Sequence, residues 1–120
     1  MRFSFNTYSQ LVYSYDRICY QIYSTVDLFN SNKIMLQYLD YAALKESIRK
    51  EESNIVVLLL DVLLTSDPYS IKLNKKKGES ISIFNQDKTD VLTGKIGLVS
   101  FIQIGHSNKI RVDLVDLNLI

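Results

Sequence analysis

Residues 8–26 carry apolar side chains at the spacing of an amphipathic helix. These side chains recur every three or four residues and fall within one arc of a 3.6-residue helix. They are Tyr8, Leu11, Val12, Tyr15, Ile18, Cys19, Ile22, Tyr23 and Val26. Thr7 followed by Gln10 has the form of a capping box, in which both side chains satisfy backbone donors at a helix start. The pattern therefore predicts a first helix that ends at about Asp27.

Two tyrosines of this segment lie outside the apolar arc. Tyr13 and Tyr20 are seven residues apart, and Arg17 lies between them on the same side of the predicted helix. Tyr and Arg are enriched at binding hot spots, so one interpretation is a protein-binding face made of these three residues. The other interpretation is that a second layer covers this face and both tyrosines belong to the core.

The middle of the chain gives a mixed pattern. Residues 33–50 favour a second helix by propensity, although their apolar side chains spread around the axis. Residues 55–64 are almost continuously apolar, and this run is compatible with a buried strand or a third helix. We interpret it as a strand because it begins with β-branched residues. Pro68 follows closely, and the residue before a proline avoids helical backbone.

From residue 69 onward the apolar residues alternate with a period of two. Residues 70–73 and 80–83 predict two strands around a turn that contains Lys75, Lys76 and Lys77. No aromatic residue is interleaved with these lysines, and we expect Phe84 to pack beneath the hairpin.

Two long strands end the chain. Residues 95–104 are apolar on both faces, which is typical of a central strand. Residues 109–120 predict a last strand whose alternation slips between Leu114 and Val115, so we expect a β-bulge there. Gly94 and Gly97 indicate a bulge or a tight bend in the neighbouring strand.

Together these elements predict an α+β fold in a single domain, residues 1–120. Two N-terminal helices within about residues 7–52 are expected to pack on an antiparallel sheet of four to five strands within about residues 55–120. The glycines and the bulge leave a barrel-like curl of the sheet as an alternative.

Composition and charge exclude several classes of protein. Hydrophobic residues make up 47% of the chain and charged residues 22%, as in ordinary globular domains. Fourteen basic and 13 acidic residues give a net charge of +1, so no global field favours nucleic acid or anionic membranes. The longest apolar run is about half of the ~20 residues that a membrane span needs. A single cysteine and no apolar signal segment predict a cytoplasmic protein, and the Ile-, Asn- and Lys-rich composition suggests a phage or mobile-element origin.

The residues that might carry catalysis do not form a recognisable set. Residues 55–62, Ile-Val-Val-Leu-Leu-Leu-Asp-Val, resemble the strand of response-regulator receiver domains that ends in a phospho-accepting aspartate, here Asp61. That family also requires alternating strands and helices, whereas residues 69–120 show consecutive strands. His106 lies in a turn and Cys19 on the apolar arc, and a zinc site needs four ligands. We therefore expect no enzyme, no cofactor and no metal.

These observations favour a non-enzymatic protein-binding domain. Its partner is expected to be another protein or a second copy of the chain, and its contact face Tyr13, Arg17 and Tyr20. The alternative is a small nucleic-acid-binding β-barrel that uses charge alone. Its residues would be Lys72, Lys75, Lys76, Lys77 and Lys95.

Overall fold

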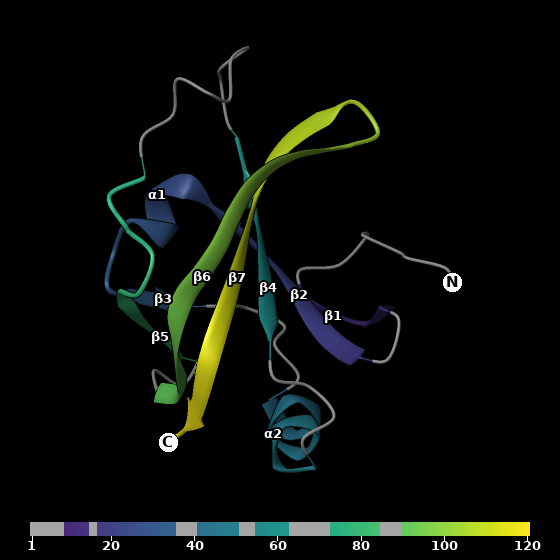
Figure 1. The fold of residues 1–120 in the computed structure, drawn as a ribbon, viewed down its shortest axis with the longest axis vertical. Helices are drawn as coiled ribbons and strands as arrows, with labels where there is room; N and C mark the ends of the chain where they lie inside the picture. Colours follow the sequence, from purple (N-terminus) through teal and green to yellow (C-terminus); the bar gives the residue numbers. More distant parts are fainter. Residues whose placement is uncertain (1–8, 15–16, 36–40, 51–54, 63–72, 85–89) are drawn as a thin grey trace.

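The computed structural model describes residues 9–14, 17–35, 41–50, 55–62, 73–84 and 90–120 (Figure 1). The strands form one seven-stranded sheet in the order β1-β2-β4-β7-β6-β5-β3. The strands are β1 (Ser9–Ser14), β2 (Arg17–Thr25), β3 (Lys33–Met35), β4 (Val56–Asp61), β5 (Ser80–Phe84), β6 (Asp90–Ile104) and β7 (Ser107–Leu119). Two short helices, α1 (Val26–Phe29) and α2 (Tyr41–Arg49), complete the described elements.

The sheet is mixed rather than antiparallel. β2 is parallel to β4, and β3 is parallel to β5, while the other neighbouring strands are antiparallel. The parallel pairs arise because the chain leaves the sheet after β2 and after β3 and returns elsewhere. The predicted fold, two N-terminal helices on a four- to five-stranded antiparallel sheet, is therefore wrong.

The first predicted helix is instead the β1–β2 hairpin and the four-residue helix α1. In the hairpin, Ser14 pairs with Arg17 and Leu11 pairs with Tyr20. The segment is rich in tyrosine, valine and isoleucine, which favour strands over helices. β2 carries apolar residues on both faces, so consecutive positions such as Cys19 and Tyr20 are both buried. That two-sided burial produced apolar spacings that also fit a helix.

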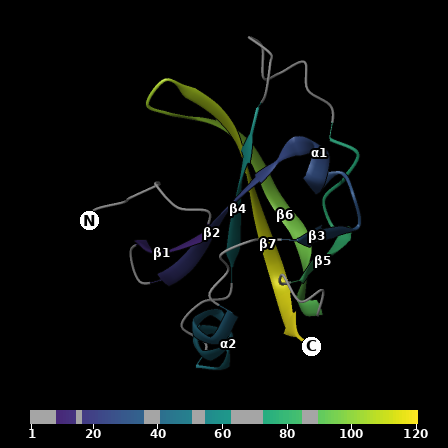
Figure 2. The same cartoon turned by 180° about the vertical axis from the view of Figure 1, so that it is seen from behind.

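The second predicted helix is right only in its C-terminal half. Residues 41–49 form α2, while Lys33–Met35 form the strand β3. Leu44 of α2 is fully buried, and the end of the helix is solvated, with an ion pair of 3.6 Å between Lys50 and Glu46. Figure 2 shows α2 near one end of β4, where it packs against the edge of the core.

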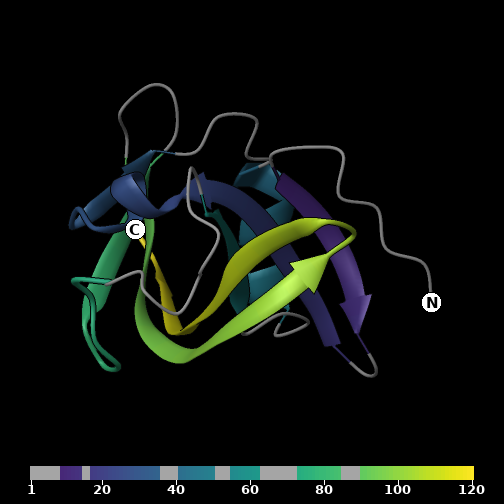
Figure 3. The ribbon, with the colours of Figure 1, turned by 90° about the horizontal axis from the view of Figure 1, so that it is seen from above.

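The main core lies on one face of the curved sheet. Tyr20 and Ile22 from β2 join the same buried cluster as Ile34 from β3 and Ile83 from β5, although these strands are far apart in the strand order. Figure 3 shows the bending of β6 and β7 that accompanies this curvature. β1 and β3 stand at the two ends of the order and are not paired with each other among the described residues, so the sheet is not a closed barrel.

β4 confirms the strand interpretation of residues 55–64 as far as Asp61. All five residues from Val56 to Leu60 are buried, because both faces of this central strand are covered. The main core covers one face, and a smaller cluster of Cys19, Val57 and Leu59 lies on the other. Burial of each such leucine contributes about 2 kcal/mol to folding.

The expected bulge of the last strand is present. Thr93 pairs with Asn118 and Lys95 with Val115, so two residues of β7, Asp116 and Leu117, face the single residue Gly94. Asp116 has a φ of 51°, in the left-handed region that non-glycine residues rarely adopt. A second bulge places Gly97 and Leu98 of β6 opposite Asp113.

Candidate binding surfaces

The predicted Tyr13–Arg17–Tyr20 face does not exist as a helix stripe. Tyr20 is 3% exposed and belongs to the main core. In the hairpin, Tyr13 pairs with Ile18 and Arg17 with Ser14, whereas Tyr20 pairs with Leu11. The side chains of Tyr13 and Arg17 lie outside the described part of the chain. Burial alternates along β2 from Tyr20 to Thr25, but Ser24 is buried and Tyr23 is half-buried, so the sequence itself does not show this alternation.

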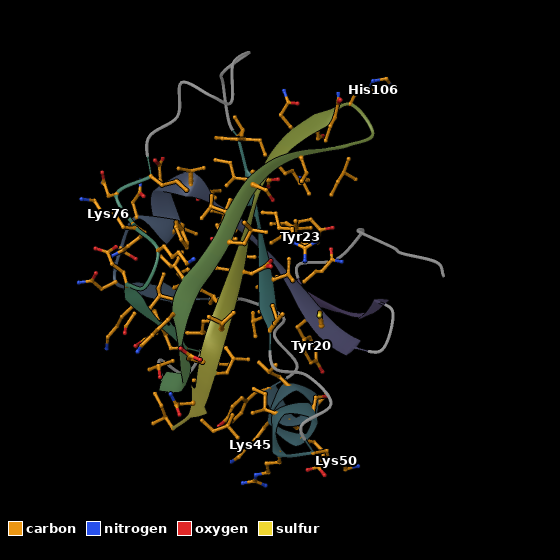
Figure 4. The ribbon with its side chains drawn as sticks, in the orientation of Figure 1. Tyr20, Tyr23, Lys45, Lys50, Lys76 and His106 are labelled. Atoms are coloured by element: carbon orange, nitrogen blue, oxygen red, sulfur yellow. The ribbon has the colours of Figure 1, made fainter. Side chains whose placement is uncertain are left out.

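A cluster of charged groups lies on the sheet face opposite the main core. Lys109 of β7 pairs with Asp61 of β4, and its Nζ forms an ion pair with Asp61 Oδ1. The same ammonium group lies 5.4 Å from the centroid of the Tyr23 ring on β2 (Figure 4). Two residues further along β7, Arg111 Nε contacts Asp113 Oδ1 at 2.9 Å. We refer to Tyr23, Asp61, Lys109, Arg111 and Asp113 as the charged cluster.

The charged cluster is suited to holding three strands in register. Burial raises the pKa of Tyr23 to about 12, and the Asp61 carboxylate contributes to the same shift. A phenol with a raised pKa stays protonated at neutral pH, so it is a poor base or nucleophile. Asp61 is a polar residue at the end of a buried strand, and the Lys109 ammonium is its ion-pair partner.

The candidate catalytic residues differ in their exposure. His106 is exposed at the turn of the β6–β7 hairpin (Figure 4), and Cys19 of β2 is buried in one cluster with Val57 and Leu59 of β4. Among the described residues, no three side chains of His, Cys, Asp or Glu form a group that could hold a metal ion. The predicted lack of enzymatic activity stays a prediction.

The far half of the β6–β7 hairpin exposes an apolar surface. β5 pairs with β6 only up to Lys95, and the hairpin continues past it to the turn at Gly105 (Figure 1). The exposed fractions in this half are 66% for Leu98, 36% for Val99 and 38% for Phe101. We call these three residues the apolar arm. Val99 and Phe101 lie opposite Val112 and Ile110, which are fully buried, so their face of β6 continues outward from the core. Leu98 lies opposite Asp113, on the other face of the strand.

Lys75, Lys76 and Lys77 do not form the tip of a free hairpin. The expected partner strand, residues 70–73, lies almost entirely outside the described residues, and β5 pairs with β3 and β6 instead. Residues 74–79 form a strap that is tied down at both ends. At one end, Asn74 N donates to Asn30 Oδ1 at 2.9 Å, and Lys75 Nζ donates to Asn32 Oδ1.

At its other end the strap joins β6. Gly78 N donates to Ile96 O at 2.8 Å, and Ile96 N donates to Glu79 O at 2.9 Å. Gly78 has a φ of 91°, which a glycine adopts without strain. Glu79 Oε2 accepts from Lys76 N at 2.9 Å and so closes the turn. The strap therefore holds three lysines next to the β3–β5–β6 edge of the sheet.

Comparisons with protein-family models, with curated proteins and with solved structures find no match for this chain. Within the described part of the structure, no helix has the length and apolar character needed to span a membrane. The function must therefore be argued from the surfaces alone.

Proposed function

We propose that this chain is a protein-binding domain that associates with a second copy of itself through the apolar arm. The observation that carries the proposal is the exposure of Leu98, Val99 and Phe101 along one short stretch of β6. An apolar patch of this kind on a small domain marks a protein contact surface more often than a solvated one.

The strand that bears the arm lacks two of the features that keep strands from associating. Residues 96–104 contain no charged residue and no proline, although a bulge begins this segment at Gly97 and Leu98. At Gly97–Ser100, no strand among the described residues pairs with the side of β6 that β5 occupies earlier. Over Gly97–Ser100 a partner is therefore offered apolar side chains beside an edge that no described strand occupies.

The arm is suited to a copy of itself because its contact is self-complementary. A two-fold axis brings the same segment of two chains together antiparallel, and each apolar side chain then faces another apolar side chain. No like charges oppose each other in such a pair, since the segment is uncharged. Two-fold dimers are also the commonest symmetric assemblies of soluble proteins.

The test is the solution mass of the wild type and of Leu98→Lys, measured by light scattering across a range of concentrations. We expect the wild type to be a dimer at about 100 µM and Leu98→Lys to be a monomer, because a buried unpaired ammonium is costly. Leu28→Lys is the matched control, because Leu28 is 51% exposed on α1, outside the arm. This control should remain a dimer.

Either of two results would contradict the proposal. A wild-type protein that is monomeric at about 100 µM has no useful self-affinity. A dimer that Leu98→Lys leaves intact uses some other surface. At protein concentrations low enough for the wild type to be monomeric, both lysine variants should unfold within about 0.5 kcal/mol of the wild type, since both sites are exposed, and this measurement separates lost association from lost folding.

A further inference from the structure

The outward face of the β3–β5–β6 edge combines lysines with hydroxyl groups. Lys33 of β3 lies opposite Ser82 of β5, and Ser80 of β5 lies opposite Lys95 of β6. The alternating residues Ile81 and Ile83 point into the core, so the serines and their cross-strand neighbours face outward. Strand spacing places the two lysines about 12 Å apart, one on each side of β5.

The strap adds three lysines beside this face. Lys75 contacts Asn32, the residue before Lys33, and Lys77 precedes Gly78, which bonds to the residue after Lys95. We call Lys33, Lys75, Lys76, Lys77 and Lys95 the lysine face. Its lysines thus come from three separate segments of the chain.

Charge is strongly segregated onto the lysine face. It holds five of the 14 basic residues. Glu79 is the one acidic residue of its strap, and Asp90 of β6 pairs with Phe84 at one end of the face. The rest of the chain has nine basic and twelve acidic residues, so a net charge of +1 conceals a cationic surface on an otherwise acidic chain. The Glu79 carboxylate is occupied by the backbone of the strap, through its bond from Lys76 N.

The same face carries an aromatic residue. The alternation along β5 puts Phe84 on the side of Ser80 and Ser82, and Phe84 is half-buried rather than packed beneath a hairpin as expected. Met35 of β3 lies opposite Phe84 and is exposed. An apolar ring therefore lies at the end of a row of hydroxyl groups that is flanked by lysines.

We propose that the lysine face binds single-stranded nucleic acid, with lysines on the phosphates and Phe84 stacked on a base. Ammonium and hydroxyl groups are the usual donors to phosphate oxygens. Cationic surfaces with an aromatic ring on a sheet are how sequence-tolerant proteins hold single strands. An anionic membrane is less well matched, because it favours protruding apolar side chains next to the cations rather than a row of serines.

The first experiment titrates the protein onto a fluorescently labelled single-stranded oligothymidylate of about 20 nucleotides, followed by anisotropy. We expect affinity to fall steeply with salt, with a log–log slope of about −0.7 for each contacted phosphate. The double variant Lys76→Gln/Lys77→Gln should bind more weakly, and its slope should be shallower by about 1.4.

The matched control removes two lysines elsewhere. Lys45 lies on α2 and Lys50 directly follows it, both away from Lys76 (Figure 4). Lys45→Gln/Lys50→Gln changes the net charge by the same amount. This control should keep the wild-type affinity and slope. Phe84→Leu tests stacking, and we expect it to weaken binding about tenfold without changing the salt slope. Its melting temperature shows whether the fold is kept.

Four results would overturn the proposal. They are no binding at about 50 mM salt, equal losses in the two lysine double variants, equal affinity for a duplex of the same length, and preference for phosphatidylserine vesicles over the oligonucleotide. The site does not depend on self-association, so Leu98→Lys should bind the oligonucleotide through each monomer. Failure of one proposal is thereby distinguished from failure of the other.

Discussion

The two halves of β6 have opposite surface character. Up to Lys95 the strand lies between β5 and β7, and its outward residues, Thr93 and Lys95, are polar. Beyond Gly97 it is bordered by β7, and it exposes Leu98 and Val99. The same strand thus helps to form the lysine face at one end and the apolar arm at the other. The exposure of residues along β6 is therefore set by where the neighbouring strand ends, not by the residues' own preference for burial.

The surface character of β6 changes at the position of the two bulges. Gly94 faces Asp116 and Leu117, and Asp113 faces Gly97 and Leu98, so each strand of the hairpin has one extra residue within a short distance. Bulges bend a strand and increase its twist. They therefore turn the far half of the hairpin away from the plane that β5 shares with the near half.

Two alanine variants test whether the far half of the β6–β7 hairpin is surface or core, and one of them should lower the free energy of unfolding more than any other change proposed for the hairpin. Phe101 and Ile110 lie opposite each other in the hairpin, but Ile110 is fully buried and Phe101 is 38% exposed. We expect Ile110→Ala to lower the free energy of unfolding by about 2–5 kcal/mol, because it leaves a cavity in the core. Phe101→Ala should cost less, about 1 kcal/mol, because the Phe101 side chain already contacts solvent and its removal leaves no enclosed cavity.

Urea denaturation of the two variants measures both values. Equal losses would show that Phe101 is a core residue, and the apolar arm would then lose its role as a contact surface. The measurement belongs at low protein concentration, because dimerisation itself raises the apparent stability of the wild type.

A smaller loss of stability is expected at Gly97, where the two halves of β6 meet. A Cβ atom at Gly97 would lie 3.3 Å from Asp113 O and 3.3 Å from Val115 Cγ1, so larger side chains must displace the neighbouring strand. We expect Gly97→Val to cost about 1–3 kcal/mol in thermal or urea unfolding. Gln103→Val, at an exposed position of the same strand, is the control and should stay within about 0.5 kcal/mol. A Gly97→Val variant as stable as this control would show that the bulge does not need a glycine.

The sequence was most informative where strands are amphipathic and consecutive. The alternation of residues 80–83, the two-sided strand after Lys95 and the slip after Leu114 all correspond to observed strands or to the observed bulge. In these segments the pattern depends on neighbours that are close along the chain, since β5, β6 and β7 are adjacent in both sequence and sheet. Local patterns suffice for such hairpins.

The helix prediction for the N-terminal segment is wrong for the opposite reason. β2 is central and buried on both faces, and its neighbour β4 is a parallel strand that lies more than thirty residues later. Two-sided burial removes the alternation that identifies a strand, and a parallel partner leaves no turn signal. The lysine face was missed in part for a related reason, because the pairing of Lys33 and Lys95 around β5 depends on long-range register.

The smallest expected effect concerns the charged cluster, which lies on the other face of the far half, where Ile102 pairs with Lys109. The pKa of Tyr23 is raised from 10.0 to about 12, so the folded state holds the phenol proton more tightly than the unfolded state does. The neutral phenol therefore stabilises the fold fully below about pH 10, and this contribution is lost as the pH rises towards about 12.

Urea unfolding at about pH 9 and about pH 12 should show a greater loss of stability for the wild type than for Tyr23→Phe, which has no phenol to ionise. Parallel losses in the two proteins would mean that Tyr23 is solvated and that the far half of β6 does not shield this face. The variant Asp61→Asn separates the two causes of the Tyr23 pKa shift. Because burial is the larger cause, Asp61→Asn should still lose more stability between about pH 9 and about pH 12 than Tyr23→Phe does.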